Sequence, residues 1–238
     1  MKKTVVITQS NYLPWRGYFD LLRSAHEVVL LDSVQYTRRD WRNRNRIKTP
    51  NGIQWLTISV RAKGSFSQSI DKMTIADPRW AAKHVRMIEM AYRRAPCFDV
   101  IAPWLFEQLR SVATEPLLTK VNEHLLRALC DRLGIKVPIV RDHELFDHET
   151  LRRMEPSERL IAILKALGST RYLSGPAARD YLDLNRFAAE NIEVAWMAYD
   201  DYPEYLQLWG TFEPRVSVVD LLLNTGDDAP RYLRRVAA

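Results

Sequence analysis

The stretch TVVITQSNYLPWRGYFDLLRSAHEVVLLD, residues 4–32, decides the fold. Its first part, residues 4–8, is rich in β-branched side chains and predicts a strand. Residues 17–25 carry apolar side chains at helical spacing. Residues 27–32 form a continuous apolar run ending in a carboxylate, which is typical of a strand buried on both faces of a parallel sheet. Together these segments predict a βαβ opening with a right-handed crossover.

The remaining chain predicts a hairpin, central helices, and a return to alternating strands and helices. Asn51-Gly52 indicates a hairpin turn because both residues tolerate positive φ, and an alternating run follows at residues 55–60. We expect helices near residues 78–94, 99–112, 115–133, 156–167, 176–183 and 217–224, and strands near 137–140, 171–175 and 192–197. The expected class is α/β: a parallel-type sheet opening with a βαβ unit, a β-hairpin excursion, and a central helical insert or subdomain.

The composition fits one α/β domain over residues 1–238, in which the helices at about 78–134 form a cap or subdomain. A hydrophobic content of 47% supports a core, and 27% charged residues argue against disorder. No apolar run reaches the roughly 20 residues that a bilayer span needs. Polar residues from Gln9 onward interrupt any signal-peptide pattern, so we expect a cytoplasmic protein.

Two cysteines, Cys97 and Cys130, are too few for a disulfide framework and suit a reducing compartment. No Cys-x-x-Cys pair indicates a structural zinc site. The polar run 142–149 contains Asp, His and Glu, but we interpret it as a solvent-facing loop and predict no metal there.

The net charge of +6 and the isoelectric point of about 9.4 permit an anionic partner. Such a partner is a nucleotide, a nucleotide-sugar, an aminoacyl-tRNA or an anionic lipid headgroup; the alternative is a basic surface that only maintains solubility. The densest basic cluster runs from Arg38 to Arg46.

Motifs across nearly the whole chain carry a family resemblance. In the first third they are Gln9-Ser10-Asn11-Tyr12-Leu13-Pro14-Trp15-x-Gly17-Tyr18-Phe19-Asp20, Leu31-Asp32-Ser33-Val34-Gln35-Tyr36, Trp41-x-Asn43-Arg44-Asn45-x-Ile47 and Gly52-x-x-Trp55-Leu56-Thr57. Later ones are Trp80, His84, Tyr92, Pro96-x-Phe98, Tyr172-Leu173-Ser174-Gly175, Tyr181-Leu182, Tyr205-x-Gln207, Phe212-x-Pro214 and Ser217-x-x-Asp220-x-Leu222-x-Asn224-x-Gly226. In this order the motifs resemble the WbqC-like protein family. Ser10 departs from the proline usual there, which changes the stiffness of the loop.

The resemblance implies a bacterial protein of O-antigen, lipopolysaccharide or related polysaccharide biosynthesis. It suggests a transferase that moves an aminoacyl group, such as glycyl, to an amino-sugar or similar amine. A nucleotide and an activated aminoacyl donor are the two candidate co-substrates, a nucleotide-sugar or amino-sugar is the candidate substrate, and nothing in the residues supports an aminoacyl-tRNA. Neither the cofactor nor the oligomeric state is indicated.

Polar residues follow the first two expected strands, where open α/β sheets bind ligands. Gln9, Asn11 and Tyr12 follow the first strand, and Asp32 and Gln35 follow the second. Their hydrogen-bonding groups suit a polyhydroxylated or amide-bearing substrate. The alternative is that they cap strands and form turns.

Two further segments are candidate anion sites. Arg44 and Asn45 lie in the family-like hairpin motif, and arginine binds phosphate or carboxylate in a bidentate manner. Ser174-Gly175 closes an expected strand and opens a helix, whose first amides can hold an anion. A solvated hairpin and a plain serine cap are the alternatives.

A second, weaker resemblance is to nucleotidyltransferases of the His-x-Gly-His type. Here Pro14-Trp15-Arg16-Gly17-Tyr18 occupies the place of that motif, and Leu173 to Arg179 is similar to a later phosphate-binding element. Trp15 and Tyr18 replace both histidines, so this resemblance implies nucleotide binding without the histidine-dependent chemistry.

Acid–base candidates are His84, on an expected helix, and Asp32. A lone helical histidine is more often structural. Tyr205, Gln207 and Asp220 are predicted to contact substrate, although Asp220 equally suits the first turn of a helix. Three hypotheses follow: an acyl or aminoacyl transferase, a nucleotide-dependent ligase or nucleotidyltransferase relative, and a non-catalytic ligand-binding protein of the same pathway.

Overall fold

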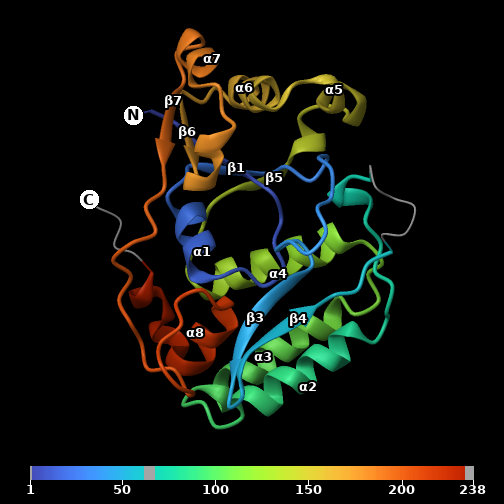
Figure 1. The fold of residues 1–238 in the computed structure, drawn as a ribbon, viewed down its shortest axis with the longest axis vertical. Coiled ribbons are helices and arrows are strands. Elements are labelled where there is room, and N and C mark those ends of the chain that lie inside the picture. Colours follow the sequence, from blue (N-terminus) through green and yellow to red (C-terminus); the bar gives the residue numbers. More distant parts are fainter. Residues whose placement is uncertain (1, 62–67, 234–238) are drawn as a thin grey trace. The chain divides into compact units, whose positions relative to one another are not determined.

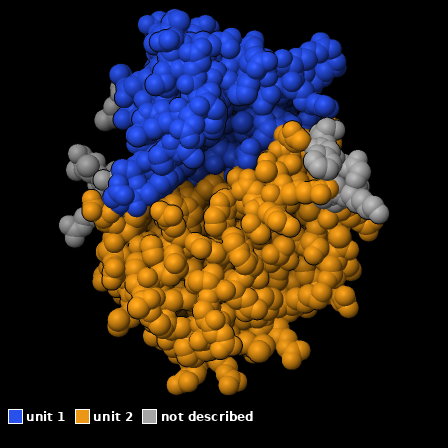
Figure 2. Space-filling model, in the orientation of Figure 1, with its two compact units in different colours: residues 1–9, 20–34, 136–200 blue, residues 10–19, 35–135, 201–238 orange. Residues whose placement is uncertain are grey.

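The computed structural model describes residues 2–61 and 68–233, which form two compact units (Figures 1 and 2). Unit 1 consists of Met1–Gln9, Asp20–Val34 and Lys136–Asp200. Unit 2 consists of Ser10–Phe19, Gln35–Ile135 and Asp201–Ala238. Both units are therefore discontinuous in sequence, and helix α1 (Arg16–Arg23) has residues in each.

Unit 1 is built on a five-stranded parallel sheet in the order β5-β2-β1-β6-β7. The strands are β1 (Thr4–Thr8), β2 (Glu27–Leu30), β5 (Ile139–Arg141), β6 (Arg171–Ser174) and β7 (Glu193–Trp196). The chain moves from the central β1 to one edge and then returns to the other side of β1. This topology confirms the predicted α/β class with its βαβ opening.

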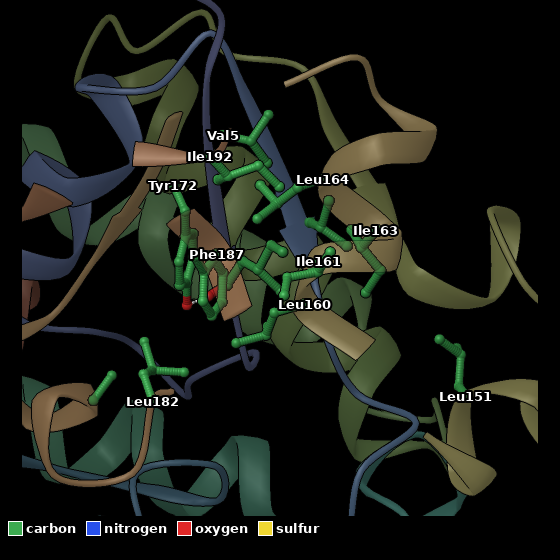
Figure 3. Packing of buried hydrophobic residues seen from close by; sticks show 13 residues of the cluster. Val5, Leu151, Leu160, Ile161, Ile163, Leu164, Tyr172, Leu182, Phe187 and Ile192 are labelled. Carbon is green, nitrogen blue, oxygen red and sulfur yellow. Dashed lines mark hydrogen bonds between the residues drawn. The ribbon is translucent and has the colours of Figure 1, made fainter. Parts of the chain in front are cut away.

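The core of unit 1 lies between this sheet and helices α5 (His148–Arg153), α6 (Pro156–Ala166) and α7 (Leu184–Ala189) (Figure 3). Leu160 and Leu164 of α6 belong to the same buried cluster as Val5 of β1, and the rings of Tyr172 and Phe187 stack with centroids 5.9 Å apart. Burying each such side chain contributes roughly 1.5–3 kcal/mol.

Unit 2 combines helices with a two-stranded antiparallel hairpin. The hairpin strands are β3 (Arg44–Thr49) and β4 (Gly52–Thr57), and the helices are α2 (Trp80–Tyr92), α3 (Phe98–Ser111), α4 (Leu118–Arg132) and α8 (Val218–Thr225). The 3-10 helices Ile70–Lys72 and Gly226–Tyr232 also belong to it. None of the helices in the described parts of the chain has the length and apolar character to cross a membrane.

The hairpin and the three central helices are confirmed, but several local expectations are wrong. The second hairpin strand begins at Gly52, three residues before the expected start, because Pro50 and Asn51 form the turn and Thr49 pairs with Gly52. Gly52 takes the positive φ of 98° that a hairpin entry of this kind needs. The helix expected at 176–183 is only a short 3-10 helix, Pro176–Asp180.

The segment expected to be a solvent-facing loop, residues 142–149, is exposed at four positions but is not an irregular loop. It contains the 3-10 helix Asp142–Glu144 and the start of α5. Asp142 is fully buried and accepts hydrogen bonds from the backbone amides of Ser33 (2.9 Å) and His143 (2.8 Å). Asp147 caps α5 by accepting from the Thr150 amide. Asp142 is therefore an internal acceptor and Asp147 a helix cap, whereas Glu144 and Glu149 face solvent.

Candidate functional site

In unit 1, predicted site residues gather at the carboxyl edge of the parallel sheet. Gln9 follows β1, Asp32 lies two residues beyond β2, and Ser174 ends β6. Because β1 and β6 are neighbours with Val5 opposite Tyr172, the residues that follow them lie at the same edge. The chain leaves these two strands toward opposite sides of the sheet, so this edge is the topological switch point of unit 1.

The Ser174-Gly175 end of β6 is closely packed. The Ser174 hydroxyl donates to the hydroxyl oxygen of Tyr172 (3.1 Å), and a Cβ on Gly175 would lie 3.4 Å from the hydroxyl oxygen of Tyr199. Burial, followed by the nearby carboxylate of Asp20, raises the pKa of Tyr199 to about 12, so its hydroxyl stays protonated at neutral pH. Tyr199 was not predicted, although it follows β7 as the other candidates follow their strands.

In unit 2, the loop after residue 9 is fixed from two distant segments. Leu13 has a positive φ of 41°, and its carbonyl accepts hydrogen bonds from the Asn45 side-chain amide (2.9 Å) and the Ser217 hydroxyl (2.8 Å). Asn45 also donates to the carbonyl of Tyr12 (3.2 Å). Both amide contacts of Asn45 therefore hold the backbone of this loop.

His84 lies in the interior of unit 2. Only 3% of it is exposed, and its Nδ1 lies 2.8 Å from the hydroxyl oxygen of Tyr12. Burial lowers the pKa of His84 to about 4, although a hydrogen bond with the Thr57 backbone opposes this. Trp80 packs edge-on against Tyr12, with centroids 6.0 Å apart. The imidazole is therefore neutral at pH 7.

Asp220 is the centre of a second buried network in unit 2. It is fully buried and accepts hydrogen bonds from the hydroxyls of Tyr92 (2.7 Å) and Tyr205 (2.7 Å) and from the Gln207 amide (2.9 Å). Lys48 donates to the side-chain oxygen of Gln207 (2.7 Å). Burial raises the pKa of Asp220, while its three hydrogen-bond donors and Lys48 lower it.

The structure thus brings together Tyr205, Gln207 and Asp220, which the sequence had only suggested separately. Lys48 and Tyr92 complete the network and were not predicted to take part in a site. Tyr92 belongs to the family-like motifs, and its place in them was the sequence signal that could have identified it as a member of this network.

The other predicted residues of unit 2 differ in accessibility. Tyr18 is buried, Trp15 and Asn11 are half-buried, and Gln35 is exposed. Any Cβ at Gly17 would collide with the indole of Trp15, so glycine gives that ring its space. Arg44 places its guanidinium carbon 4.1 Å from the ring centroid of Trp55.

The predicted residues therefore divide between the units. Gln9, Asp32, Ser174 and Gly175 belong to unit 1, and the others belong to unit 2. The role of each in binding or catalysis stays a prediction.

Comparisons with known proteins place the chain in a family. The model of the WbqC-like protein family matches residues 9–232. A protein of Mycobacterium tuberculosis (strain ATCC 25618 / H37Rv), "Uncharacterized protein Rv1507c", is 46% identical over 235 residues, which cover 98% of each chain. No solved structure gives a significant match. The chain therefore belongs to the WbqC-like protein family, as its motifs predicted.

Proposed function

We propose that this protein is a transferase of bacterial surface-polysaccharide or related biosynthesis that binds a nucleotide-linked donor at the switch point of unit 1. The strand order β5-β2-β1-β6-β7 carries the proposal. When the five strands of this sheet are renumbered by their order along the chain, the spatial order is 3-2-1-4-5. This is the strand order of doubly wound nucleotide-binding sheets. Such sheets bind ligands beyond the carboxyl ends of the strands where the chain reverses direction.

Two residues at this edge suit a nucleotide. Asp32 follows the second strand, where a carboxylate in such folds accepts hydrogen bonds from ribose hydroxyls. Gly175 follows the fourth strand in chain order and lies against the protonated hydroxyl of Tyr199, a donor that suits the oxygen acceptors of a nucleotide. The loop after β1 has no Gly-x-Gly-x-x-Gly pattern, so the phosphates would be held differently from those of a dinucleotide cofactor.

The transferred group in this proposal is aminoacyl, for which the family resemblance is the support. The acceptor amine forms the new N–C bond and loses one proton, and the donor oxygen leaves from the acyl carbon. For the base we favour Asp32 over His84. Asp32 and His84 are equally buried, at 4% and 3% exposed, but Asp32 lies at the carboxyl edge of the parallel sheet. The Nδ1 of His84 is already bonded to the Tyr12 hydroxyl.

Isothermal titration calorimetry tests this proposal with ATP, a nucleotide-sugar and an aminoacyl-adenylate analogue. We expect one of these to bind, and Asp32→Asn to weaken binding roughly tenfold or more, because a hydrogen bond to a charged group is lost. Asp180→Asn is the matched control, since Asp180 is an exposed carboxylate of the same unit and should bind normally.

The proposal is wrong if none of the three compounds binds to the folded protein, or if Asp32→Asn and Asp180→Asn bind equally well. Binding of ATP with release of pyrophosphate on adding an acceptor would instead indicate a nucleotidyltransferase. Binding of a ligand that is never converted would indicate a non-catalytic protein.

A further inference from the structure

Unit 2 exposes two neighbouring tryptophans, Trp55 on hairpin strand β4 and Trp41 in the turn before β3. Trp41 is 40% exposed and Trp55 is 39% exposed, whereas the other five tryptophans are buried or half-buried. Exposing two indoles side by side forgoes the hydrophobic stabilisation that their burial would give. Together with Arg44 and Arg46 they form a surface that we call the Arg–Trp face.

The side chains of the Arg–Trp face are held in a defined arrangement. The two indole centroids lie 5.6 Å apart with an interplanar angle of 36°. The guanidinium carbon of Arg44 lies 4.1 Å from the Trp55 centroid, and that of Arg46 lies 5.7 Å from Trp41 and 5.9 Å from Trp55. These are cation–π distances.

Backbone groups fix both arginines. Arg46 donates to the carbonyl of Arg215 (2.6 Å), and Arg44 donates to the carbonyl of Arg39. Arg46 is also the cross-strand partner of Trp55. The face is therefore largely organised before any ligand binds, which lowers the entropic cost of binding.

The chemistry of this face is that of hydrogen-bond donors and aromatic rings. Within the described residues, neither indole N–H has a hydrogen-bond acceptor, and the guanidinium groups add positive charge. Glu213 is the carboxylate that pairs with Arg46, at 3.9 Å, and in the described chain no acidic side chain forms a salt bridge with Arg44. A complementary ligand is anionic, rich in oxygen acceptors, and has an apolar face to lie on an indole.

We propose that the Arg–Trp face binds a phosphorylated saccharide, with the sugar ring on the indoles and the phosphate at the guanidinium groups. This inference goes beyond the proposed function and is carried by the arrangement of the Arg–Trp face alone. Single-stranded nucleic acid suits the face less well. It requires a basic groove along the strand and separate rings for successive bases, whereas these indoles form one tilted patch between two anchored arginines.

NMR of the full chain with ¹⁵N-labelled tryptophan tests the inference, with indole signals assigned through Trp41→Phe and Trp55→Phe. The ligands are glucose 6-phosphate, glucose, inorganic phosphate and a short single-stranded RNA. We expect glucose 6-phosphate to shift both assigned signals saturably. Its dissociation constant should be roughly tenfold lower than that of glucose or phosphate alone, because the ring and the charge both contribute.

Arg44→Ala should weaken this binding roughly tenfold, because it removes a charge-assisted contact. Arg132→Ala is the matched control, since Arg132 lies 5.8 Å from the ring of Trp104 elsewhere in the same unit and should leave binding unchanged. The other indole signals report whether each variant is folded.

Three outcomes would overturn the inference: signals that respond to RNA but not to glucose 6-phosphate, an equal response to inorganic phosphate alone, or unchanged binding in Arg44→Ala. These outcomes are distinct from failure of the proposed function. Nucleotide binding with an inert Arg–Trp face contradicts only this inference, whereas saccharide binding without nucleotide binding contradicts only the proposed function.

Discussion

The two units place their candidate polar residues in different parts of the fold. In unit 1 the candidates Gln9, Asp32 and Ser174 lie at the carboxyl ends of parallel strands, although Asp32 and Ser174 are largely buried there. In unit 2 the family-like polar residues Asn45 and Asp220 point inward and hold loops and hydroxyls together. A family motif therefore does not by itself indicate contact with substrate, since the same residue types also determine the shape of the protein.

Removing the inward carboxylate of unit 2 should have the largest effect. Asp220→Ala removes the acceptor of three buried hydrogen bonds and leaves the hydroxyls of Tyr92 and Tyr205 without it, so we expect it to lower the free energy of unfolding by about 4 kcal/mol. Urea unfolding measures this. Asp220→Asn keeps an acceptor and should cost clearly less. A loss below about 1 kcal/mol for the alanine variant would mean that the network adds little to stability.

A cavity in the core of unit 1 should cost somewhat less. Leu164 is fully buried against β1, so Leu164→Ala should lower the free energy of unfolding by about 3 kcal/mol. Native-state hydrogen exchange should show the increase in exchange concentrated in the strands of unit 1. Leu184→Ala, at a side chain that is 49% exposed in the same unit, is the control and should change little. Equal effects of the two substitutions on the free energy of unfolding would contradict the placement of Leu164 in the core of unit 1.

The buried imidazole of unit 2 should make stability depend on pH. Its folded pKa of about 4 lies below the ordinary value of 6.5, so the unfolded chain binds the proton more readily. Stability from this group is complete above pH 6.5 and falls as the pH drops toward 4, by about 2 kcal/mol at pH 5. Asp220 opposes this trend, because its raised pKa favours the folded state as it becomes protonated.

Unfolding of the wild type and of His84→Gln at pH 7, 6 and 5 isolates the histidine contribution. The variant should lack the loss between pH 6.5 and 5. An unchanged pH profile would show that His84 is protonated as easily in the folded protein as in the unfolded chain, which an accessible general base would permit and a buried one would not.

The smallest effect should come from one hydroxyl. Tyr12→Phe removes the partner of the His84 Nδ1 and should cost about 1 kcal/mol in unfolding free energy. Tyr181→Phe, at a ring that is 64% exposed in unit 1, should be neutral. If Tyr12→Phe is as neutral as its control, the contact between Tyr12 and His84 has no net stabilising value.

Much of the fold was predictable because its signals are local. The β-branched run at residues 4–8, the apolar run at 27–32 and the Asn51-Gly52 pair specify two strands and a hairpin within a few residues. The division into two units was not predictable, since it depends on which distant segments pack together. Short elements such as α7 (Leu184–Ala189) were missed because six residues show too little periodicity.

The site was predictable only in part. Strand-end positions identified Gln9, Asp32 and Ser174, because parallel strands end at a common edge. The network around Asp220 joins residues 48, 92, 205, 207 and 220, and no sequence spacing reveals such a meeting. Burial also distinguishes two adjacent residues that the sequence had treated alike. Asn45 is 2% exposed and holds a loop, whereas Arg44 lies on an exposed indole.

The discontinuity of both units has a consequence for biosynthesis. In unit 1, β1 pairs with β6, so the first strand leaves the ribosome more than 160 residues before its partner. In unit 2, the hydrogen bond from the hydroxyl of Ser217 to the carbonyl of Leu13 forms only after residue 217 has been synthesised. Neither unit is completed until nearly the whole polypeptide has been translated. The nascent chain therefore leaves the apolar strand β1 without its β6 neighbour for most of elongation, and a cell that makes this protein slowly has to protect that edge from aggregation.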